Sequence, residues 1–433
     1  MTTTTSSTAP TAHRSFAADL LLPAAQLGLR YAEQLVTSAP ADSFARMPMK
    51  DVNSAAFNIG HLSTYGDRVC AMLGRNDLIT PMPYSVDLFK AGAPCLDQPG
   101  LYPEKDVLVA TFFERQRRAI EAFRGRERTD VFILFPEGRV SDVQRRQMTT
   151  PSEANVHAVA IDGTFDDAQA RVKDMFNDFA FRDEVGLAGV NSINWARVLA
   201  QVVYYFSAAV SLGAPGRKVS FTVPTGNFGD VFAGYIAKQM GLPIERLVVA
   251  TNQNDILHRC LSTGAYIPDG VQPSISPSMD IQVSSNFERA LYFAYGKDGA
   301  AVAGLMEELK AGGFTLSQGV KAALAGAFDS GRCSEAETSA TITATLKNAA
   351  ELLCPHTAVG VKVAEEQRVQ GVPMITLATA HPAKFPDAVE AASGIRPGLP
   401  PHMADLFERP ERVTRLSNDL SALEAHVREH RRK

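Results

Sequence analysis

The chain has 433 residues, a formal charge of −4 and 45% hydrophobic residues, enough for two or three domains with packed cores. The nearly balanced charge excludes a protein that binds nucleic acid or an anionic membrane surface through a general positive field. No run approaches the roughly 20 uninterrupted apolar residues that a membrane-spanning helix needs.

Before about residue 124 the sequence predicts helices only. Residues 1–15 are rich in Thr, Ser and Ala, which predicts a disordered tail. Apolar residues recur at i, i+3 and i+4 spacing in residues 16–36, 54–73 and 107–123. This part of the chain is therefore expected to be an all-α domain.

After residue 130 short β-type runs alternate with helical patterns. Repeated strand-then-helix units predict an α/β fold with a mainly parallel sheet and helices on both faces. Residues 164–167 carry a capping-box pattern at a helix start. The predicted strands are residues 131–135, 158–161, 219–224, 247–250 and 374–377, and the helices that follow later strands include residues 231–240, 255–261 and 388–392.

Four loops of this part carry polar residues that simple turns do not need: residues 225–230, 251–255, 379–385 and 191–197. In open parallel sheets ligands bind outside the carboxyl ends of the strands. We therefore expect one crevice to collect these loops.

The run Val219 to Asp230 is the most informative segment, because an alternating strand passes through a turn with two glycines into a helix. Gly226 and Gly229 let backbone N–H groups approach a phosphate closely, and the helix N-terminus adds unpaired donors. The sequence predicts a phosphorylated cofactor here. An ordinary strand-to-helix turn is the alternative, since short glycine motifs occur often by chance.

From about residue 120 to the C-terminus the chain resembles the threonine synthase family, which consists of pyridoxal-phosphate enzymes of fold type II (tryptophan-synthase-β-like). The resemblance implies a small α/β domain over residues 119–205 and a large cofactor-binding α/β domain over residues 206–433. It rests on residues 131–136, 147–150, 190–197, 224–234, 250–259, 276–289, 355–360 and 379–385.

The resemblance implies conversion of O-phospho-L-homoserine and water into L-threonine and phosphate, with pyridoxal 5′-phosphate as the electron sink. Thr379 would face the pyridine nitrogen. The residues that would hold the cofactor phosphate are Gly226, Asn227, Phe228 and Gly229, and those that would hold the substrate phosphate are Arg259, Lys384, Asn191 and Asn194.

Each substrate residue has a structural alternative. Arg259 and Lys384 would instead be solvated or pair with Asp255 and Asp387. The two asparagines, Asn191 and Asn194, would cap helices. His381 fits a structural hydrogen bond as well as a catalytic role, and Trp195 is expected in the core.

Two motifs of the family are missing from this sequence. They are a Phe-Lys-Asp segment that supplies the lysine bound to the cofactor and a Ser-Gly-Asp-Thr-Gly loop that binds substrate. Lys50, within Lys-Asp-Val, enters a helical region, and Lys90 follows Leu-Phe. Neither is expected to be the catalytic lysine, which therefore stays unidentified, so turnover is doubtful.

Residues 16–118 resemble the DinB-like helical-bundle superfamily through residues 53–62 and 101–106. Such domains are four-helix bundles, and many bind a divalent metal through three histidines. His61 matches the first ligand, but the fourth helix is absent. His426 and His430 are expected at a solvated helix end, so no metal site is predicted.

The sequence thus describes three helices of a bundle fused to a cofactor fold that lacks its first third. Incomplete sheet and bundle surfaces would favour a partner or self-association. The N-terminal helices are expected to cover part of the sheet without replacing its strands. The alternatives are a non-catalytic fusion or misassembled chain that binds pyridoxal phosphate weakly, and a DinB-like metal- or thiol-dependent module.

The cysteines favour a reducing cytoplasm over a disulfide framework, because they are odd in number and form no CxxC pair. They are Cys70, Cys95, Cys260, Cys333 and Cys354.

Overall fold

The computed structural model describes residues 29, 33, 36, 40–47, 53–72, 74–90, 93–98, 100–123, 130–190 and 194–431. The chain divides into two compact units. The first unit comprises Met1–Ile133, Ser152–His157 and Glu429–Lys433, and the second comprises Leu134–Pro151 and Ala158–Arg428.

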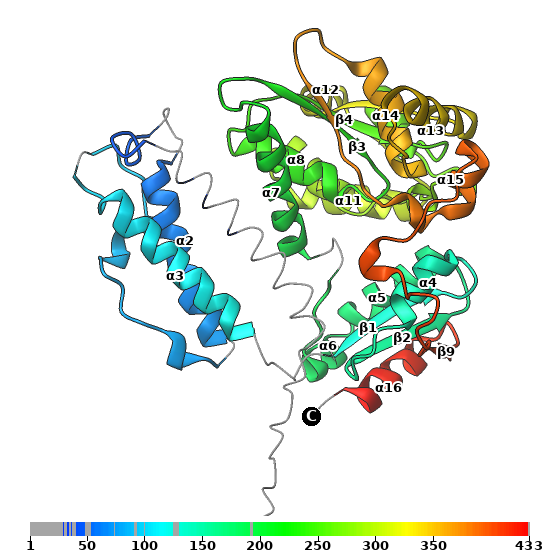
Figure 1. The fold of residues 1–433 in the computed structure, drawn as a ribbon, viewed down its shortest axis with the longest axis horizontal. Coiled ribbons are helices and arrows are strands. Elements are labelled where there is room, and N and C mark those ends of the chain that lie inside the picture. Colours follow the sequence, from blue (N-terminus) through cyan, green and yellow to red (C-terminus); the bar gives the residue numbers. More distant parts are fainter. Residues whose placement is uncertain are drawn as a thin grey trace, which may run out of the picture. The chain divides into compact units, whose positions relative to one another are not determined.

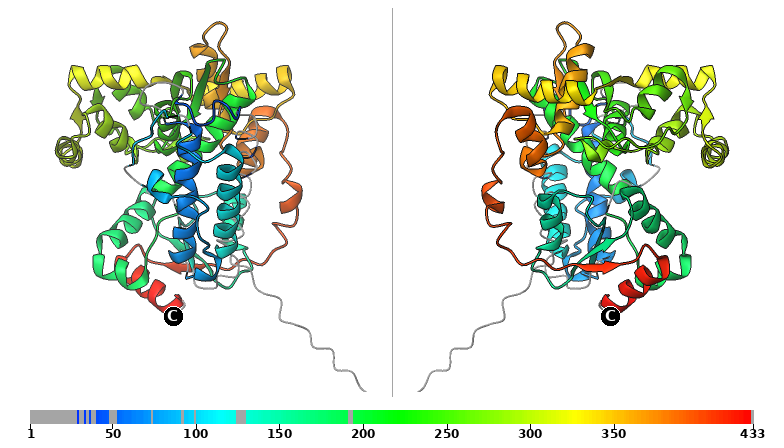
Figure 2. Two further views of the ribbon diagram at one scale, coloured as in Figure 1. Left: turned by 90° about the vertical axis from the view of Figure 1, so that its left-hand side faces the viewer. Right: turned by 90° about the vertical axis from the view of Figure 1, so that its right-hand side faces the viewer.

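In the first unit two helices, α2 (Ala55–Met72) and α3 (Lys105–Phe123), lie side by side (Figures 1 and 2). Their shared core includes Phe57, Phe89 and Leu108, all buried. The predicted helices over 54–73 and 107–123 are therefore confirmed. The predicted tail and most of the helix over 16–36 lie outside the described residues.

A three-stranded sheet has the order β1 (Val131–Pro136), β2 (Val156–Ile161), β9 (Thr414–Leu416). β2 and β9 are parallel, with Val159 opposite Thr414. A strand near the C-terminus therefore joins a sheet whose other two strands lie more than 250 residues earlier. The sequence analysis placed β2 and β9 in different domains, 119–205 and 206–433, although they pair in one sheet. The domain boundary at residue 205 stays a prediction. In chain order, α4 (Asp142–Thr149) follows β1, α5 (Phe165–Asn177) and α6 (Phe179–Val185) follow β2, and α16 (Leu420–His430) follows β9.

The second unit contains a four-stranded parallel sheet, of which Figure 1 labels β3 and β4. Its order is β7 (Asp329–Arg332), β4 (Ile244–Thr251), β3 (Val219–Pro224), β8 (Met374–Thr376). Every residue of β3 is buried, as expected for a parallel strand covered on both faces.

Successive residues of β4 point to opposite faces of this sheet. Leu247 and Val249 join the core that contains α8 (Gly229–Gln239), whereas Val248 joins the core that contains α14 (Pro355–Gln367). The predicted α/β fold with helices on both faces of a parallel sheet is confirmed.

The other helices described are α7 (Trp195–Ser211), α9 (Ile256–Thr263), α10 (Phe287–Ala294), α11 (Gly299–Lys310), α12 (Gln318–Ala327), α13 (Glu335–Ala349) and α15 (Pro386–Ser393). Two short antiparallel strands are β5 (Ala265–Tyr266) and β6 (Phe314–Thr315). Short 3₁₀ turns are η1 (Asn76–Leu78), η2 (Val86–Leu88), η3 (Pro277–Met279), η4 (Pro382–Lys384) and η5 (Pro401–Met403).

Two burial predictions were wrong. Trp195 is 45% exposed at the start of α7, where its ring contacts Phe232 and the Arg289 guanidinium. His426 is buried, not solvated, because it shares the inner face of α16 with Leu423 and Val427. Among the described residues no helix is long and apolar enough to cross a membrane.

Candidate functional site

Three of the polar loops begin at the same edge of the four-stranded sheet. Pro224 at the end of β3 lies opposite Ala250 of β4, and Thr222 lies opposite Thr376 of β8. The Thr225 N–H donates to the carbonyl of Ala250 at 2.8 Å, which ties the start of one loop to the neighbouring strand. The parallel register therefore gathers the loops at 225–230, 251–255 and 379–385, three of the four predicted; the fourth, 191–197, lies partly outside the described residues, so the single crevice stays a prediction.

The loop between β3 and α8 is held by the segment at residues 284–287. Ser284 Oγ donates to the Gly226 carbonyl at 2.7 Å, and the Ser285 N–H donates to Asn227 Oδ1 at 3.2 Å. The Phe228 N–H donates to the Ser285 carbonyl, and its fully buried ring packs against Phe287. Phe228 thus anchors the loop through the core, which leaves its neighbours free to present backbone groups.

Gly226 lies against backbone. A Cβ atom at this position would be 2.6 Å from the Ser278 carbonyl oxygen, so only glycine fits without a shift of the main chain. In the described part of the chain no group accepts from the backbone N–H of Asn227, Gly229 or Asp230. We call residues 226–230 the cradle. Its unmatched donors at a helix N-terminus suit an anion.

Asp230, in the first turn of α8, receives hydrogen bonds from two tyrosines of α7. The Tyr204 hydroxyl donates to Asp230 Oδ1 at 2.5 Å and the Tyr205 hydroxyl donates to it at 3.1 Å. Burial raises the pKa of Asp230, which favours the uncharged form of this last residue of the cradle.

Lys384 lies in η4, which follows β8 and Thr379. Burial lowers the pKa of its ammonium group, whose nitrogen is 5.8 Å from the centre of the Phe385 ring. The predicted alternative partner, Asp387, pairs instead with Arg396 at 3.0 Å. Within the described part of the chain no carboxylate lies within ion-pair distance of Lys384.

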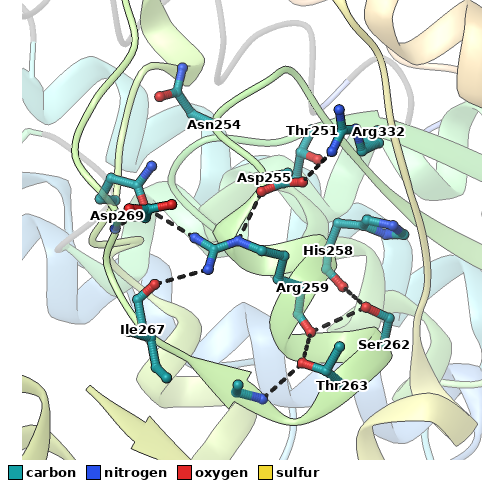
Figure 3. A network of polar contacts seen from close by, with 12 residues as sticks. Thr251, Asn254, Asp255, His258, Arg259, Ser262, Thr263, Ile267, Asp269 and Arg332 are labelled. Atoms are coloured by element: carbon teal, nitrogen blue, oxygen red, sulfur yellow. Dashed lines mark hydrogen bonds and ion pairs between the residues drawn. The ribbon is translucent and has the colours of Figure 1, made fainter. Parts of the chain in front are cut away.

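Arg259 is engaged with neighbouring residues (Figure 3). Its Nε donates to Asp255 Oδ1 at 2.9 Å, and the other oxygen of Asp255 accepts from Arg332 at 3.0 Å. A further guanidinium nitrogen of Arg259 donates to the carbonyl of Ile267. Arg259 thus forms the ion pair with Asp255 that the sequence analysis gave as the alternative to binding the substrate phosphate.

A family model described as the C-terminal part of threonine synthase matches residues 357–427. Threonine synthase from Pseudomonas aeruginosa is 52% identical over 327 residues, which are 75% of this chain and 70% of that protein. The chain belongs to the threonine synthase family.

Solved structures agree with this assignment. A structure titled as pyridoxal-phosphate-bound threonine synthase from Brucella melitensis shares 60% identity with a TM-score of 0.67, covering 73% of this chain and 68% of that one. The yeast threonine synthase structure shares 40% identity with a TM-score of 0.63, covering 72% and 67%. The predicted family and the fold-type II architecture are confirmed.

The remaining predicted residues of this threonine synthase relative are placed as follows. Thr379 is exposed, three residues beyond the end of β8. Asn194 is the N-cap of α7, its Oδ1 accepting from the Ala196 N–H at 2.9 Å. Asn191 lies outside the described residues. His381 accepts from the Ala383 N–H, which favours its structural alternative.

The sequence analysis set two lysines aside as candidates for the catalytic lysine. Lys50 lies outside the described residues. Lys90 is exposed and pairs with Asp87 at 3.2 Å.

Sequence reasoning missed His356 and Ser278. The Ser278 N–H donates to His356 Nε2 at 3.1 Å, and the His356 ring packs on the Phe385 ring with 4.6 Å between centroids. Both residues lie in runs that carry the family resemblance, 276–289 and 355–360. The sequence offered one signal for this pair, a histidine within a run that resembles the family. It did not indicate that the partner of His356 is Ser278, which lies 78 residues away.

No group of three or more metal-ligating side chains occurs among the described residues. His61 instead bonds through Nδ1 to the Phe89 carbonyl at 2.6 Å, and its Nε2 lies 3.4 Å from the Tyr65 hydroxyl. Both ring nitrogens are thus occupied within the first unit.

Proposed function

We propose that this chain binds pyridoxal 5′-phosphate, with the phosphate ester in the cradle. The observation that carries the proposal is the combination of unmatched N–H groups at Asn227, Gly229 and Asp230 with a glycine that no side chain could replace. Such donors bind phosphate at helix N-termini. The solved Brucella melitensis threonine synthase holds the same cofactor.

The family reaction assigned here is conversion of O-phospho-L-homoserine and water into L-threonine and phosphate. When bound, the cofactor supplies an electron sink for this chemistry. Thr379, at the edge where β8 ends, is the residue proposed to face the pyridine nitrogen. A hydroxyl there, unlike a carboxylate, leaves that nitrogen unprotonated.

Lys384 is our first choice for the substrate phosphate. It is a partly buried cation without an ion-pair carboxylate in the described part of the chain, so its charge is available to an anion. Arg259 ranks second because Asp255 already offsets its charge. Asn194 ranks below both, since its side chain caps α7, and Asn191 remains a proposal from the sequence.

Turnover is proposed to be low or absent, because no lysine of this chain matches the family motif for covalent attachment of the cofactor. A chain that binds the cofactor without catalysis is the second candidate. The missing Phe-Lys-Asp and Ser-Gly-Asp-Thr-Gly motifs favour it.

One experiment separates the two candidates. The full chain is purified with pyridoxal phosphate, its visible absorption is recorded, and borohydride reduction is followed by peptide mapping. A specifically labelled lysine together with phosphate release from O-phosphohomoserine would establish the enzyme. Cofactor bound without a label or phosphate release would establish the non-catalytic candidate, and absence of binding would refute the cofactor proposal.

For the first unit the DinB-like bundle and the fusion remain proposals. Both ring nitrogens of His61 make hydrogen bonds, Nδ1 with the Phe89 carbonyl and Nε2 with the Tyr65 hydroxyl. These bonds favour a structural role for His61 over metal binding. Elemental analysis of the purified chain tests the structural role of His61. Stoichiometric zinc or nickel in the parent chain that is lost in His61→Ala would contradict that role.

We also propose a cytoplasmic location and self-association or a partner. The exposed apolar side chains Leu199, Val203 and Val210 on α7 support association. Analytical ultracentrifugation tests it, since a monomer at all concentrations would refute self-association.

A further inference from the structure

The wall of the cradle opposite Gly226 is the 3₁₀ turn η3. A Cβ placed on Gly226 would meet the Ser278 carbonyl oxygen at 2.6 Å and the Met279 Cα at 3.1 Å. The position of Ser278 therefore sets the width of the cradle at this point.

His356 holds this wall by a hydrogen bond from the other side. Its Nε2 accepts from the Ser278 N–H at 3.1 Å, and its ring is only 4% exposed. A backbone N–H can only donate, so Nε2 must carry the lone pair and the proton of the neutral ring must be on Nδ1. Burial and the charge of Lys384 lower the pKa of His356 to about 3, which keeps the ring neutral.

The Nδ1 atom of His356 is buried without a hydrogen-bond partner in the described part of the chain. An unmatched buried donor is unfavourable for stability. An apolar side chain would avoid this loss but would leave the Ser278 N–H without its acceptor. The acceptor at Nε2 is what the ring contributes.

The segment that carries Ser278 is also fixed at its flanks. Asp280 accepts from the Ser274 N–H and from Asn252 Nδ2, each at 2.8 Å, and Asn252 lies in the loop after β4. Asp280 thus ties the segment to β4, whereas His356 ties its centre to α14. The ring of His356 also packs on Phe385, next to Lys384.

We propose that His356 is a positioning residue of the cofactor site: its Nε2 fixes Ser278 against Gly226 and thereby sets the affinity of the cradle for a phosphate ester. The inference rests on the proposed function, because it assigns the cradle to the cofactor phosphate. It concerns a residue that does not itself contact the ligand.

The test uses the full chain with His356→Gln, His356→Asn and His356→Ala. The Gln amide can reach the position of Nε2 and accept from Ser278, whereas the Asn amide ends near the position of Nδ1 and is the matched control. Pyridoxal phosphate and pyridoxal, which lacks the phosphate, are titrated by absorbance. We expect Ala and Asn to weaken pyridoxal phosphate binding about tenfold, Gln to stay within about threefold of the parent, and pyridoxal binding to change little.

Hydrogen exchange of peptides containing Ser278, measured without ligand, gives an independent readout. We expect protection in the parent and Gln chains and faster exchange in the Ala and Asn chains. Equal weakening by Gln and Asn, or equal loss of pyridoxal binding, would overturn the inference. If the parent binds neither compound, the proposed function fails. Unchanged exchange in the Asn chain would separately show that His356 does not fix the wall.

Discussion

Replacing Gly226 with alanine tests the cradle most directly. The added Cβ would lie 2.6 Å from the Ser278 carbonyl oxygen and 3.1 Å from the Met279 Cα. Both atoms are main chain, so no side-chain rotation relieves the contact and η3 must move. Extra methyl groups in packed sites typically cost about 1–3 kcal/mol, which is the expected fall in the free energy of unfolding.

The same movement should weaken cofactor binding, because it displaces one wall of the cradle. A matched control is Gly304→Ala, on the exposed face of α11, where a Cβ meets no described atom within 4 Å. There alanine should raise the free energy of unfolding by about 1 kcal/mol through helix propensity. Urea unfolding and pyridoxal phosphate titration of the full chain measure both effects.

The two glycines are therefore expected to differ in the sign of the stability change. A Gly226→Ala chain with parental stability and parental pyridoxal phosphate affinity would refute the reasoning. Loss of stability with unchanged affinity would refute only the assignment of the cradle to the phosphate.

Three further predictions use urea unfolding. Phe228→Ala should lower the free energy of unfolding by about 3–5 kcal/mol, because the ring is fully buried; a loss below about 1 kcal/mol would contradict its anchoring role. Arg259→Gln should cost about 1 kcal/mol or less, since Asp255 keeps its pair with Arg332; a much larger loss would show that Arg332 does not compensate. Hydrogen bonds at the start of α13 hold the pKa of Glu337 at about 2, below its usual 4.5, so its stabilisation should be full above pH 4.5 and disappear toward pH 2. The difference in urea midpoint between the parent and Glu337→Gln should shrink as the pH falls from 4.5 toward 2. A constant difference would refute the stabilising role of the Glu337 carboxylate.

Local signals in the sequence were sufficient for much of the fold. Thr164 and Asp167 form the predicted capping box of α5. The buried strand before Gly226 and the helix after it also follow from residues adjacent in sequence. These features depend on hydrogen bonds and periodicities within one or two turns, which a sequence displays directly.

Contacts between distant residues could not be predicted in the same way. The Tyr204 and Tyr205 hydroxyls reach Asp230 only because α7 packs on α8. His356 reaches Ser278 only because α14 covers the sheet from its other face. No local pattern encodes such pairings, and without the fold a tyrosine pair or a histidine before threonine is indistinguishable from core packing.

Arg259 and Lys384 show how the fold separates residues that the sequence treats alike. Both are cations in polar loops or first turns at the carboxyl edge of the sheet, and each has an acidic residue nearby in sequence. In the fold Asp255 lies one helical turn from Arg259 and pairs with it, whereas Asp387 pairs with Arg396 and leaves Lys384 without that partner. A buried ammonium group gains more from a bound anion than one already paired, because its charge has lost water without gaining a counterion. The partial burial of Lys384 without a counterion is therefore the physical reason for proposing it, ahead of Arg259, as a contact of the substrate phosphate.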